Sequence, residues 1–268
     1  MSPFDYARAK TVQEAVSYLA DNPDAKLLAG GMSLLSAMKL RLAAPTRLID
    51  LADIPDIRGV QLESNELVIG AMTRHADVAA SPIVKRCIPA LAALAGGIGD
   101  RQVRNRGTIG GSIANADPAA CYPAAVLGLN ATVVTNRRRI AGDEFFLGLF
   151  ETALEPGEMV TSVRFPIPEK AAYVKFHQQA SRFALVGVMA AIMPKKEVRI
   201  AVTGAKASVF RAAEIEAALS HRFDPEQVLG VKLPVADMNT DLHADAEYRA
   251  HLVSVIAARA VDCINRMH

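Results

Sequence analysis

Cysteine is scarce in this sequence, and the positions of the few cysteines exclude several kinds of site. The 268 residues include three of them, Cys87, Cys121 and Cys263. An odd number of widely separated cysteines fits neither a disulfide framework nor the clustered spacing of zinc and iron–sulfur ligands. The six histidines form no HxxxH or similar ligand pair. We therefore expect residues of this chain to bind no metal.

The sequence also lacks an excess of either charge and a long apolar run. Its 30 Lys and Arg against 28 Asp and Glu give a net charge of +2, too small for the electrostatic footprint of a nucleic-acid-binding protein. The single basic cluster, 137–139, is typical of a solvated turn. No apolar stretch reaches the roughly 18 residues of a membrane span, and the first residues lack the order of a signal peptide. We expect a soluble, cytoplasmic protein without a nucleic-acid partner.

Helices and strands alternate in the first part of the chain. Hydrophobic residues make up 51% of the sequence, enough for one large domain or two or three small ones. Thr11, three residues before Glu14, forms a capping box that predicts a helix ending near Asn22. The pattern then predicts a strand that runs into a glycine turn at 30–31, a helix at 33–43 with Leu34, Leu35, Met38 and Leu42 on one face, a strand at 47–51, a hairpin turning at 64–65, and one helix from Pro82 to Gly96-Gly97.

The second part begins with a polar, glycine-rich stretch. Residues 99–122 are dense in Gly, Asn, Asp and Arg, which predicts irregular structure until a helix begins at Pro123 and leads into a strand at 131–135. Pro166, Pro168 and the charged pair that follows break the pattern, so we place a domain boundary near residue 170. Beyond it the sequence predicts strands at 172–178, 188–193 and 198–205 and helices at 210–220 and 248–267.

Two segments pair adjacent glycines with a hydroxyl residue, at 29–33 and 107–112. Such turns let consecutive backbone N–H groups point into one concavity, because glycine permits positive φ and close approach. A helix that begins at Ser33 or Leu34 adds partial positive charge at the first turn, and a diphosphate is the natural occupant. Most Gly-Gly pairs are merely tight turns, however. Neither segment matches a Rossmann fingerprint or a P-loop, so spacing alone predicts only a generic anion site.

Three segments resemble the signature segments of a known family. They are LLAGGMSLLSAMKLRL, IGDRQVRNRGTIGGSIANADPA and KFHQQASRFALVGV. The chain resembles, over essentially its whole length, the FAD-binding medium subunit of the molybdenum hydroxylases, the carbon monoxide dehydrogenase and xanthine dehydrogenase family. The resemblance implies an α+β fold: a two-subdomain FAD-binding domain of the vanillyl-alcohol oxidase (PCMH) type at 1–170, divided into about 1–56 and 57–170, and a small C-terminal α+β domain at 171–268.

The resemblance also implies which residues hold FAD. The first turn wraps one side of the FAD diphosphate, with backbone N–H groups and the Ser33 hydroxyl as donors, and the second turn closes on the other side. The residues concerned are Lys26, Leu28, Ala29, Gly30, Gly31, Met32, Ser33 and Leu34 in the first segment and Gly107, Thr108, Ile109, Gly110, Gly111, Ser112 and Ala114 in the second.

Other positions are assigned by the same resemblance. Ile98 matches an apolar position near the flavin, and Met159 and Val160 match a pair that contacts the adenine, although ordinary core packing explains all three equally well. Lys175 or Gln178 occupies the place of a basic residue near the isoalloxazine. Phe183 either shields that ring or simply packs against the protein.

One departure from the family pattern concerns the segment after the second turn. Relatives commonly read DPAAD there, and the last Asp binds a ribityl hydroxyl, whereas this chain has Cys121. A thiol is a poor acceptor and is uncharged at neutral pH, so that hydrogen bond is weakened or comes from another group. Asp117 is retained, either as an FAD contact or as the cap of the following helix.

The function implied by the resemblance is that of an electron-transfer flavoprotein subunit. A large partner subunit holds a molybdenum pterin, a small one holds two [2Fe–2S] clusters, and this chain passes electrons through FAD to an acceptor within a dimer of heterotrimers. No residue of this chain is then expected to act as a substrate acid or base. Two alternatives are a self-contained flavin oxidoreductase of the same FAD fold and a scaffold subunit that has lost flavin.

Overall fold

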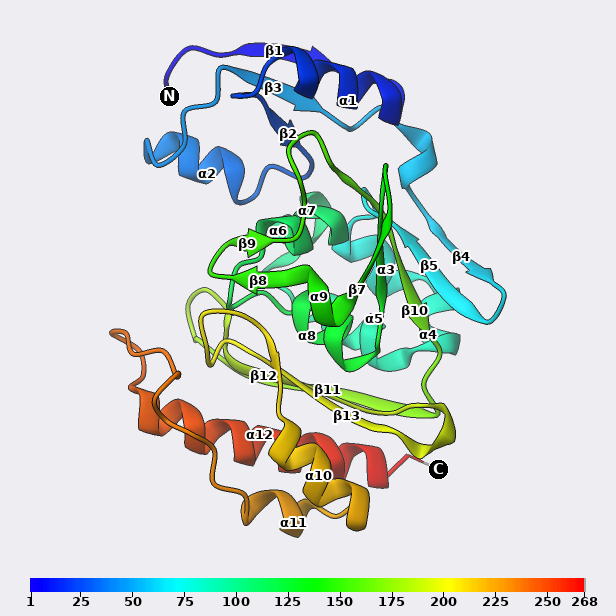
Figure 1. The fold of residues 1–268 in the computed structure, drawn as a ribbon, viewed down its shortest axis with the longest axis vertical. Helices are drawn as coiled ribbons and strands as arrows, with labels where there is room; N and C mark the ends of the chain where they lie inside the picture. The colour runs from blue at the N-terminus through cyan, green and yellow to red at the C-terminus, as the bar shows by residue number, and fades with distance from the viewer. Residues whose placement is uncertain (268) are drawn as a thin grey trace.

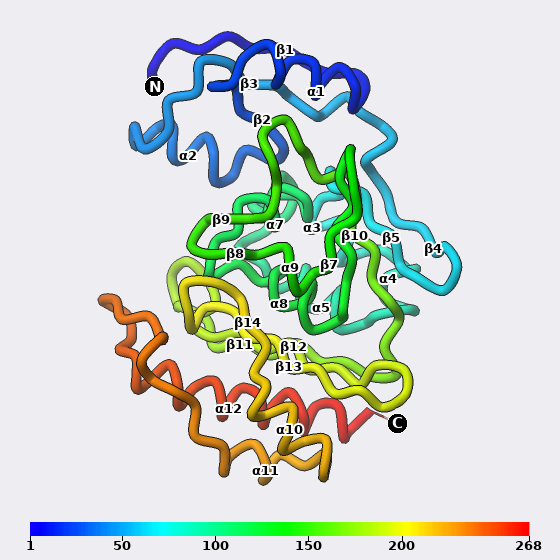
Figure 2. The backbone as a smooth tube through the Cα atoms, in the orientation of Figure 1, coloured from blue at the N-terminus to red at the C-terminus, as the bar shows by residue number. Residues whose placement is uncertain are grey.

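Among residues 1–267, three β-sheets of three or more strands follow one another along the chain, and each supports a different part of the molecule (Figure 1). The computed structural model describes residues 1–267. Figure 2 shows the three parts stacked along the long axis, with the N-terminal part at one end and the C-terminal helices at the other. The mixed α+β fold expected from the sequence is confirmed. No helix in the described part of the chain is long and apolar enough to cross a bilayer.

A parallel sheet of order β1-β3-β2 supports the N-terminal part. Helix α1 begins with the predicted cap: Thr11 Oγ1 accepts the Glu14 N–H at 3.1 Å, while the Glu14 carboxylate reaches one residue beyond the N-cap and accepts the Lys10 N–H at 2.7 Å. Ala15 of this helix is buried in a small core beside Ile49. The elements are β1 (Asp5–Arg8), α1 (Val12–Asp21), β2 (Lys26–Leu28), α2 (Leu34–Lys39) and β3 (Arg47–Asp50).

Helix α2 is shorter than the helix predicted at 33–43. It has six residues, and Arg41 just beyond it has a φ of +61°. Leu42 therefore lies outside the helix and is 79% exposed, so its predicted place on a buried face is wrong. Met38 is buried, and Leu34 and Leu35 pack beside it as predicted.

An antiparallel sheet of order β4-β5-β10-β6-β7 supports the middle part. The predicted hairpin at Ser64 and Asn65 is confirmed; both residues have positive φ, 46° and 66°, as a two-residue hairpin turn requires. The strands are β4 (Val60–Glu63), β5 (Glu66–Gly70), β6 (Thr132–Thr135), β7 (Arg139–Ala141) and β10 (Val160–Pro166), and a separate small hairpin is formed by β8 (Phe146–Gly148) and β9 (Glu151–Thr152).

Short helices pack around this sheet, and two predictions about them are wrong. The single helix predicted from Pro82 is two helices, because Pro89 lacks an N–H and keeps Ile88 out of the helical region, at φ −142° and ψ 75°. The stretch predicted to be irregular contains α6 and α7. The helices are α3 (His75–Ala80), α4 (Pro82–Cys87), α5 (Pro89–Gly96), α6 (Arg101–Arg106), α7 (Ile109–Asn115), α8 (Tyr122–Gly128) and α9 (Gly142–Phe145), and a short 3₁₀ turn, η1, spans Pro55–Ile57.

An antiparallel sheet of order β11-β12-β13-β14 supports the C-terminal part. Helix α12 covers one face of this sheet, and α5 and α8 of the middle part cover the other (Figure 1). The strands predicted beyond residue 170 are confirmed, although the first residues of the helix predicted at 210–220 form β14. The elements are β11 (Lys170–His177), β12 (Ala184–Ile192), η2 (Pro194–Lys196), β13 (Val198–Thr203), β14 (Phe210–Arg211), α10 (Ala213–His221), α11 (Pro225–Leu229) and α12 (Ala246–Asn265).

Buried polar contacts join the C-terminal sheet to the middle part. Arg199 of β13, whose side chain is 4% exposed, donates to the Leu127 carbonyl at 2.9 Å and to both carboxylate oxygens of Asp143 at 2.6 and 2.8 Å. The Thr203 hydroxyl lies 2.7 Å from the carbonyls of both Pro118 and Ala120. The loop before α8 and the end of α8 are therefore both held by β13.

Candidate functional site

The first glycine turn presents a row of free backbone donors. It connects the end of β2 to Ser33, the N-cap residue of α2, and Gly31 has a φ of +76°. Within residues 1–267, no acceptor is found for the backbone N–H groups of Ala29, Gly30, Gly31, Met32 or Ser33. The Ser33 hydroxyl caps no N–H of α2 and is also free. Successive unpaired N–H groups around a residue of positive φ form an anion-binding concavity.

The second glycine segment is built differently from the prediction. Gly110 and Gly111 lie in the first turn of α7, and their N–H groups donate to the Ala71 carbonyl at 2.8 Å and to Thr108 Oγ1 at 3.2 Å. The Ile109 and Ser112 N–H groups also have acceptors, the carbonyls of Thr73 and Thr108. The expectation that this segment offers a concavity of free N–H groups is therefore wrong.

Close packing explains the glycines of the second segment. A Cβ on Gly110 would lie 2.5 Å from the Ala71 Cβ, and one on Gly107 would lie 2.5 Å from Nε2 of His75. The absence of a side chain lets α7 approach the loop between β5 and α3. These glycines position the segment rather than bind a ligand through strained backbone.

The two glycine segments lie against each other. A Cβ on Gly30 would overlap the Arg106 carbonyl, and one on Gly111 would lie 3.3 Å from the Ala29 Cβ. The free donors of the first turn therefore stand beside the start of α7, where Thr108 and Ser112 add hydroxyl groups. This cradle suits a diphosphate, because a diphosphate accepts several N–H and O–H bonds at once.

The loop between α7 and α8 contains the two residues from the family's acidic motif. Asp117 Oδ1 accepts the Ala119 N–H at 2.9 Å and so stabilises a turn. Since α8 begins at Tyr122 with Cys121 at the N-cap, Asp117 does not cap that helix. Cys121 is 5% exposed.

Lys175 joins this loop to two other segments. Its Nζ donates to the Gly97 carbonyl at 2.8 Å and to the Arg182 carbonyl at 2.9 Å, and it lies 3.5 Å from the Cys121 Sγ. Burial, with the neighbouring Cys121 thiol, raises the pKa of Tyr173 well above its usual value. The 3.5 Å contact makes Lys175 and Cys121 partners, although sequence reasoning treated them separately.

The remaining candidate residues are spread over different environments. Met159 is 2% exposed in the N-terminal core, Val160 is buried in the core of the middle part, and Ile98 is half-buried against that same core. The Gln178 side chain accepts the Ser181 N–H at 2.6 Å. Phe183 is 53% exposed and Ala114 is exposed. The side chains of Met159 and Val160 thus serve the cores.

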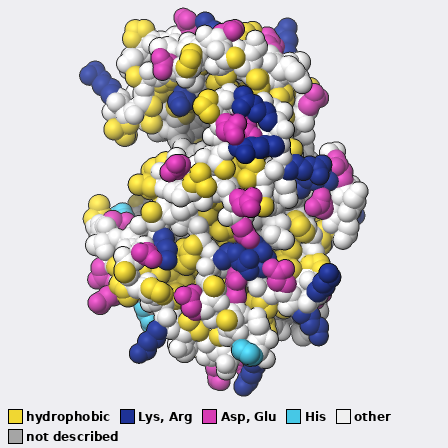
Figure 3. All heavy atoms as spheres, viewed as in Figure 1, with side chains coloured by type: hydrophobic (Ala, Val, Ile, Leu, Met, Phe, Trp, Pro, Cys, Tyr) yellow, Lys and Arg dark blue, Asp and Glu magenta, His cyan; other side chains and the backbone are white. Residues whose placement is uncertain are grey.

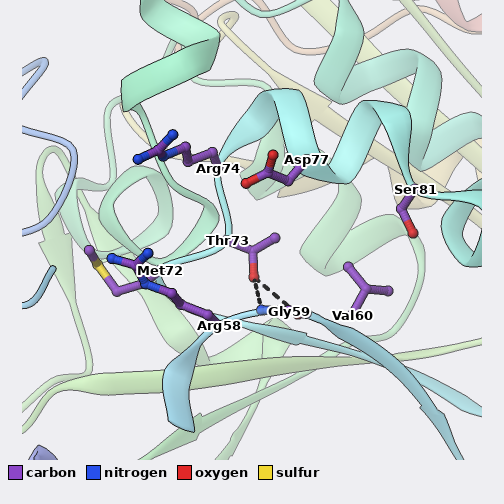
Figure 4. Close-up of a pocket in the computed structure, with 8 residues that line it drawn as sticks. All are labelled: Arg58, Gly59, Val60, Met72, Thr73, Arg74, Asp77 and Ser81. Carbon is purple, nitrogen blue, oxygen red and sulfur yellow. Dashed lines mark hydrogen bonds between the residues drawn. The ribbon is translucent and has the colours of Figure 1, made fainter. Parts of the chain in front are cut away.

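A pocket of about 450 Å³ lies between the start of β4 and helix α3 (Figure 4). On one side Thr73 Oγ1 accepts the Gly59 N–H at 2.9 Å, while the Thr73 carbonyl accepts the Ile109 N–H on the other. Arg58, Arg74 and Asp77 give the lining both signs of charge, and none of the three has an ion-pair partner within the described residues. Sequence reasoning singled out none of them, because they share no motif.

His75, which lies against Gly107 of the second glycine segment, is a buried imidazole that sequence reasoning did not single out. It is 5% exposed, its ring lies 5.3 Å from that of Tyr122, and its Nδ1 has no partner within the described residues. Burial, aided by the charge of Arg104, lowers its pKa from 6.5 to about 4. The folded protein therefore holds His75 neutral at neutral pH.

His75 should make stability depend on pH. Because the folded pKa is about 4 and the usual value is 6.5, the unfolded chain takes up a proton first as the pH falls. The free energy of unfolding should therefore fall between about pH 6.5 and pH 4, by up to about 3 kcal/mol. Urea unfolding at several pH values measures this loss. His75→Leu should remove it and His221→Leu, at an exposed position, should not; the same slope in His75→Leu would contradict the assignment.

Comparison with known proteins places the chain in a family. The family described as "FAD binding domain in molybdopterin dehydrogenase" matches residues 2–168. The chain is 38% identical to the carbon monoxide dehydrogenase medium chain of Hydrogenophaga pseudoflava over 97% of its length and 96% of that protein. It is 34% identical to the glyceraldehyde dehydrogenase medium chain of Sulfolobus acidocaldarius, over 96% of each.

Solved structures agree with this assignment. Carbon monoxide dehydrogenase from Hydrogenophaga pseudoflava matches with a TM-score of 0.88 at 36% identity, covering 98% of this chain and 97% of the matched one. The reconstituted enzyme from Oligotropha carboxidovorans matches with a TM-score of 0.91 at 31% identity, covering 98% and 99%. The chain belongs to the FAD-binding medium subunits of the molybdenum hydroxylases, of the carbon monoxide dehydrogenase type.

Proposed function

We propose that this chain passes electrons from the iron–sulfur clusters of a partner subunit, through FAD, to an external acceptor. The row of free N–H groups in the first glycine turn is the observation that carries the proposal. Relatives of similar length serve dehydrogenases of different substrates, carbon monoxide and glyceraldehyde. Substrate choice therefore belongs to another subunit. FAD, when bound, supplies the electron-carrying chemistry, and this chain supplies binding and orientation.

The FAD diphosphate would lie on the first turn, held by the N–H groups of Gly30 to Ser33 and by the Ser33 hydroxyl. The second segment would contribute the Thr108 and Ser112 side chains and a close-packed wall, since all of its backbone donors except the Thr108 N–H are occupied. The isoalloxazine end would lie toward Lys175 and Cys121, which share one cluster. The ammonium of Lys175 is held in place there by the carbonyls that it already contacts.

The domain division and the assembly are further parts of this proposal. The N-terminal and middle sheets correspond to the two subdomains of a vanillyl-alcohol oxidase type FAD domain, about 1–56 and 57–170, and the C-terminal sheet to a domain at 171–268. The partners would be a large subunit with a molybdenum pterin and a small subunit with two [2Fe–2S] clusters, arranged as a dimer of heterotrimers. No residue among 1–267 belongs to a cluster suited to a metal, which supports placing these metals in partners.

The purified chain provides the direct test. We expect it to be yellow, or to take up added FAD, and to reduce no dye when given a small substrate without its partners. A colourless chain that takes up no FAD would show that the flavoprotein proposal is wrong. Unaided reduction of the dye by a substrate would instead support a self-contained oxidoreductase.

Cys121→Asp should tighten FAD binding by about tenfold. A carboxylate restores a charged acceptor at the position where relatives carry Asp, and a hydrogen bond to a charged group contributes about 1.5–3 kcal/mol. Lys175 Nζ, 3.5 Å from the present sulfur, would keep the new carboxylate ionised. Titration of the apoprotein with FAD, followed by flavin fluorescence, measures the change.

Cys263→Asp is the matched control for that variant, because Cys263 lies exposed on α12. It should leave FAD affinity unchanged. Unchanged or weaker binding in Cys121→Asp would mean that another group already supplies the missing hydrogen bond.

A further inference from the structure

The β8–β9 hairpin exposes three large apolar side chains. Leu147 and Leu149 are each 60% exposed, and Phe150 is 59% exposed. Single exposed apolar residues are ordinary, but three within four consecutive positions form a patch. The base of the hairpin is firmly packed, since Phe145 is fully buried and its ring meets that of Phe146 edge to face at 5.0 Å. The patch is therefore presented on a well-supported element.

Folding of the hairpin does not explain the residue at its tip. Phe150 has a φ of +54°. A residue with a Cβ pays free energy for this left-handed conformation, which Gly or Asn would adopt more easily. Strained positions of this kind persist where a side chain serves a function. Phe150 thus combines a strained backbone with a ring that is 59% exposed.

The surroundings of the patch restrict what can cover it. Figure 3 shows a hollow between the N-terminal part and the rest of the molecule, with hydrophobic side chains along the rim where Figure 1 places the hairpin. Helix α2, which follows the first glycine turn, borders the same hollow. Glu144 and Glu151 beside the patch are exposed and have no basic partner among residues 1–267. A covering surface should thus be apolar at its centre and basic at its rim.

A second copy of this chain does not meet that requirement. In a two-fold contact the same patch meets itself, so Glu144 and Glu151 would face the same acidic groups of the other copy. The patch is also much smaller than the roughly 800 Å² that each partner contributes to a standard interface. It suits the central contact of a larger interface with a different protein.

We propose that the β8–β9 hairpin is the main contact by which the iron–sulfur subunit docks onto this chain, with Leu149 and Phe150 inserted into an apolar recess rimmed by Lys and Arg. This inference rests on the proposed function, because the subunit that delivers electrons must reach the side of the chain where FAD is held. The hairpin borders the same hollow as helix α2, which follows the first glycine turn (Figures 1 and 3).

The test compares three variants of the full chain, each co-expressed with the iron–sulfur and molybdenum subunits. Leu149→Glu places a charge in the patch, and Phe150→Gly removes the ring while relieving the strained backbone, so it should fold at least as readily. Leu242→Glu is the control, at an apolar position 90% exposed in the loop before α12. FAD per chain and co-purification of the iron–sulfur subunit are measured for each.

Both hairpin variants should keep a full complement of FAD and bind the iron–sulfur subunit about 100-fold more weakly, as expected for loss of a central interface contact. The control should behave as the wild type. Normal co-purification of both hairpin variants would overturn the docking proposal and leave the FAD proposal intact. Loss of FAD from Phe150→Gly would show that the hairpin supports the fold instead.

Two other outcomes separate this inference from the proposed function. In the first, the wild-type chain contains no FAD but binds the iron–sulfur subunit, and the hairpin variants do not bind it. This result would overturn the flavin proposal and support the docking surface. In the second, the wild-type chain alone is a dimer and the Leu149→Glu variant is a monomer. This result would assign the patch to contact between copies, and the docking proposal would be wrong.

Discussion

Gly31→Val is expected to weaken FAD binding at least ~100-fold while the C-terminal part stays folded. Gly31 has a φ of +76°, and a Cβ there would lie 2.9 Å from the Leu35 Cδ1. A β-branched residue cannot hold that backbone, so the turn must rotate and redirect the N–H groups of Gly31 and Met32. Loss of two charge-assisted hydrogen bonds, each worth about 1.5–3 kcal/mol, accounts for the expected factor.

Gly59→Val is the matched control for this experiment. Gly59 also has positive φ, +96°, and, its two chain neighbours aside, no heavy atom of residues 1–267 lies within 4 Å of its Cβ position. It should suffer similar backbone strain without loss of FAD. Titration of both apoproteins with FAD, with circular dichroism as the measure of folding, distinguishes them; equal FAD affinity in the two variants would contradict the role of the first turn.

A substitution at Gly110 is not an equivalent test. A side chain there would meet the Ala71 carbonyl at 2.8 Å as well as its Cβ. Any loss of FAD would then follow from displacement of α7 from the loop after β5. The distinction matters because both segments look alike in the sequence.

Arg199→Met should lower the free energy of unfolding by about 2–3 kcal/mol. The substitution removes the charged donor of the buried Leu127 carbonyl, which keeps the Asn130 N–H at 3.1 Å, and it removes the contact with Asp143. Loss of a buried hydrogen bond from a charged donor, together with an ion pair, costs about that much, but the Asp143 side chain is 40% exposed and water will compensate part of the loss. The effect should therefore fall below that of a fully buried pair.

Urea unfolding followed by circular dichroism measures the Arg199 effect. Arg266→Met is the control, since Arg266 and Asp262 form an i,i+4 pair on the surface with side chains 78% and 44% exposed. That change should cost no more than about 0.5 kcal/mol. A similar loss in both variants would mean that the Arg199 contacts do not hold the C-terminal sheet in place.

The sequence predicted the local features of the fold because neighbouring residues decide them. The capping box at Thr11 and the hairpin turn at Ser64-Asn65 each depend on a few adjacent residues. The prediction for the second glycine segment was wrong because Gly110 is required by close packing against Ala71, a residue distant in the sequence. A glycine in a sequence is compatible with either a positive φ or close approach of another segment, and the sequence alone does not distinguish the two.

In the candidate site too, features set by neighbouring residues could be predicted, and features set by distant residues could not. The first turn could be recognised from its own residues and the family pattern. The pairing of Lys175 with Cys121 could not, because it depends on how β11 packs against the loop before α8. The burial of His75, which lowers its pKa to about 4, likewise follows from tertiary packing against Tyr122 and Gly107.

The contacts of β11 and β13 bear on whether the flavin-binding half can be used as a transplantable module. The family match ends at residue 168, yet the acceptors of Lys175 and Arg199 include the carbonyls of Gly97 and Leu127 on the other side of that point. Truncation at residue 168 would remove the sheet that packs against α5 and α8 and would expose the residues around Cys121 to solvent. A chimera built around the proposed FAD site would need to include the C-terminal sheet.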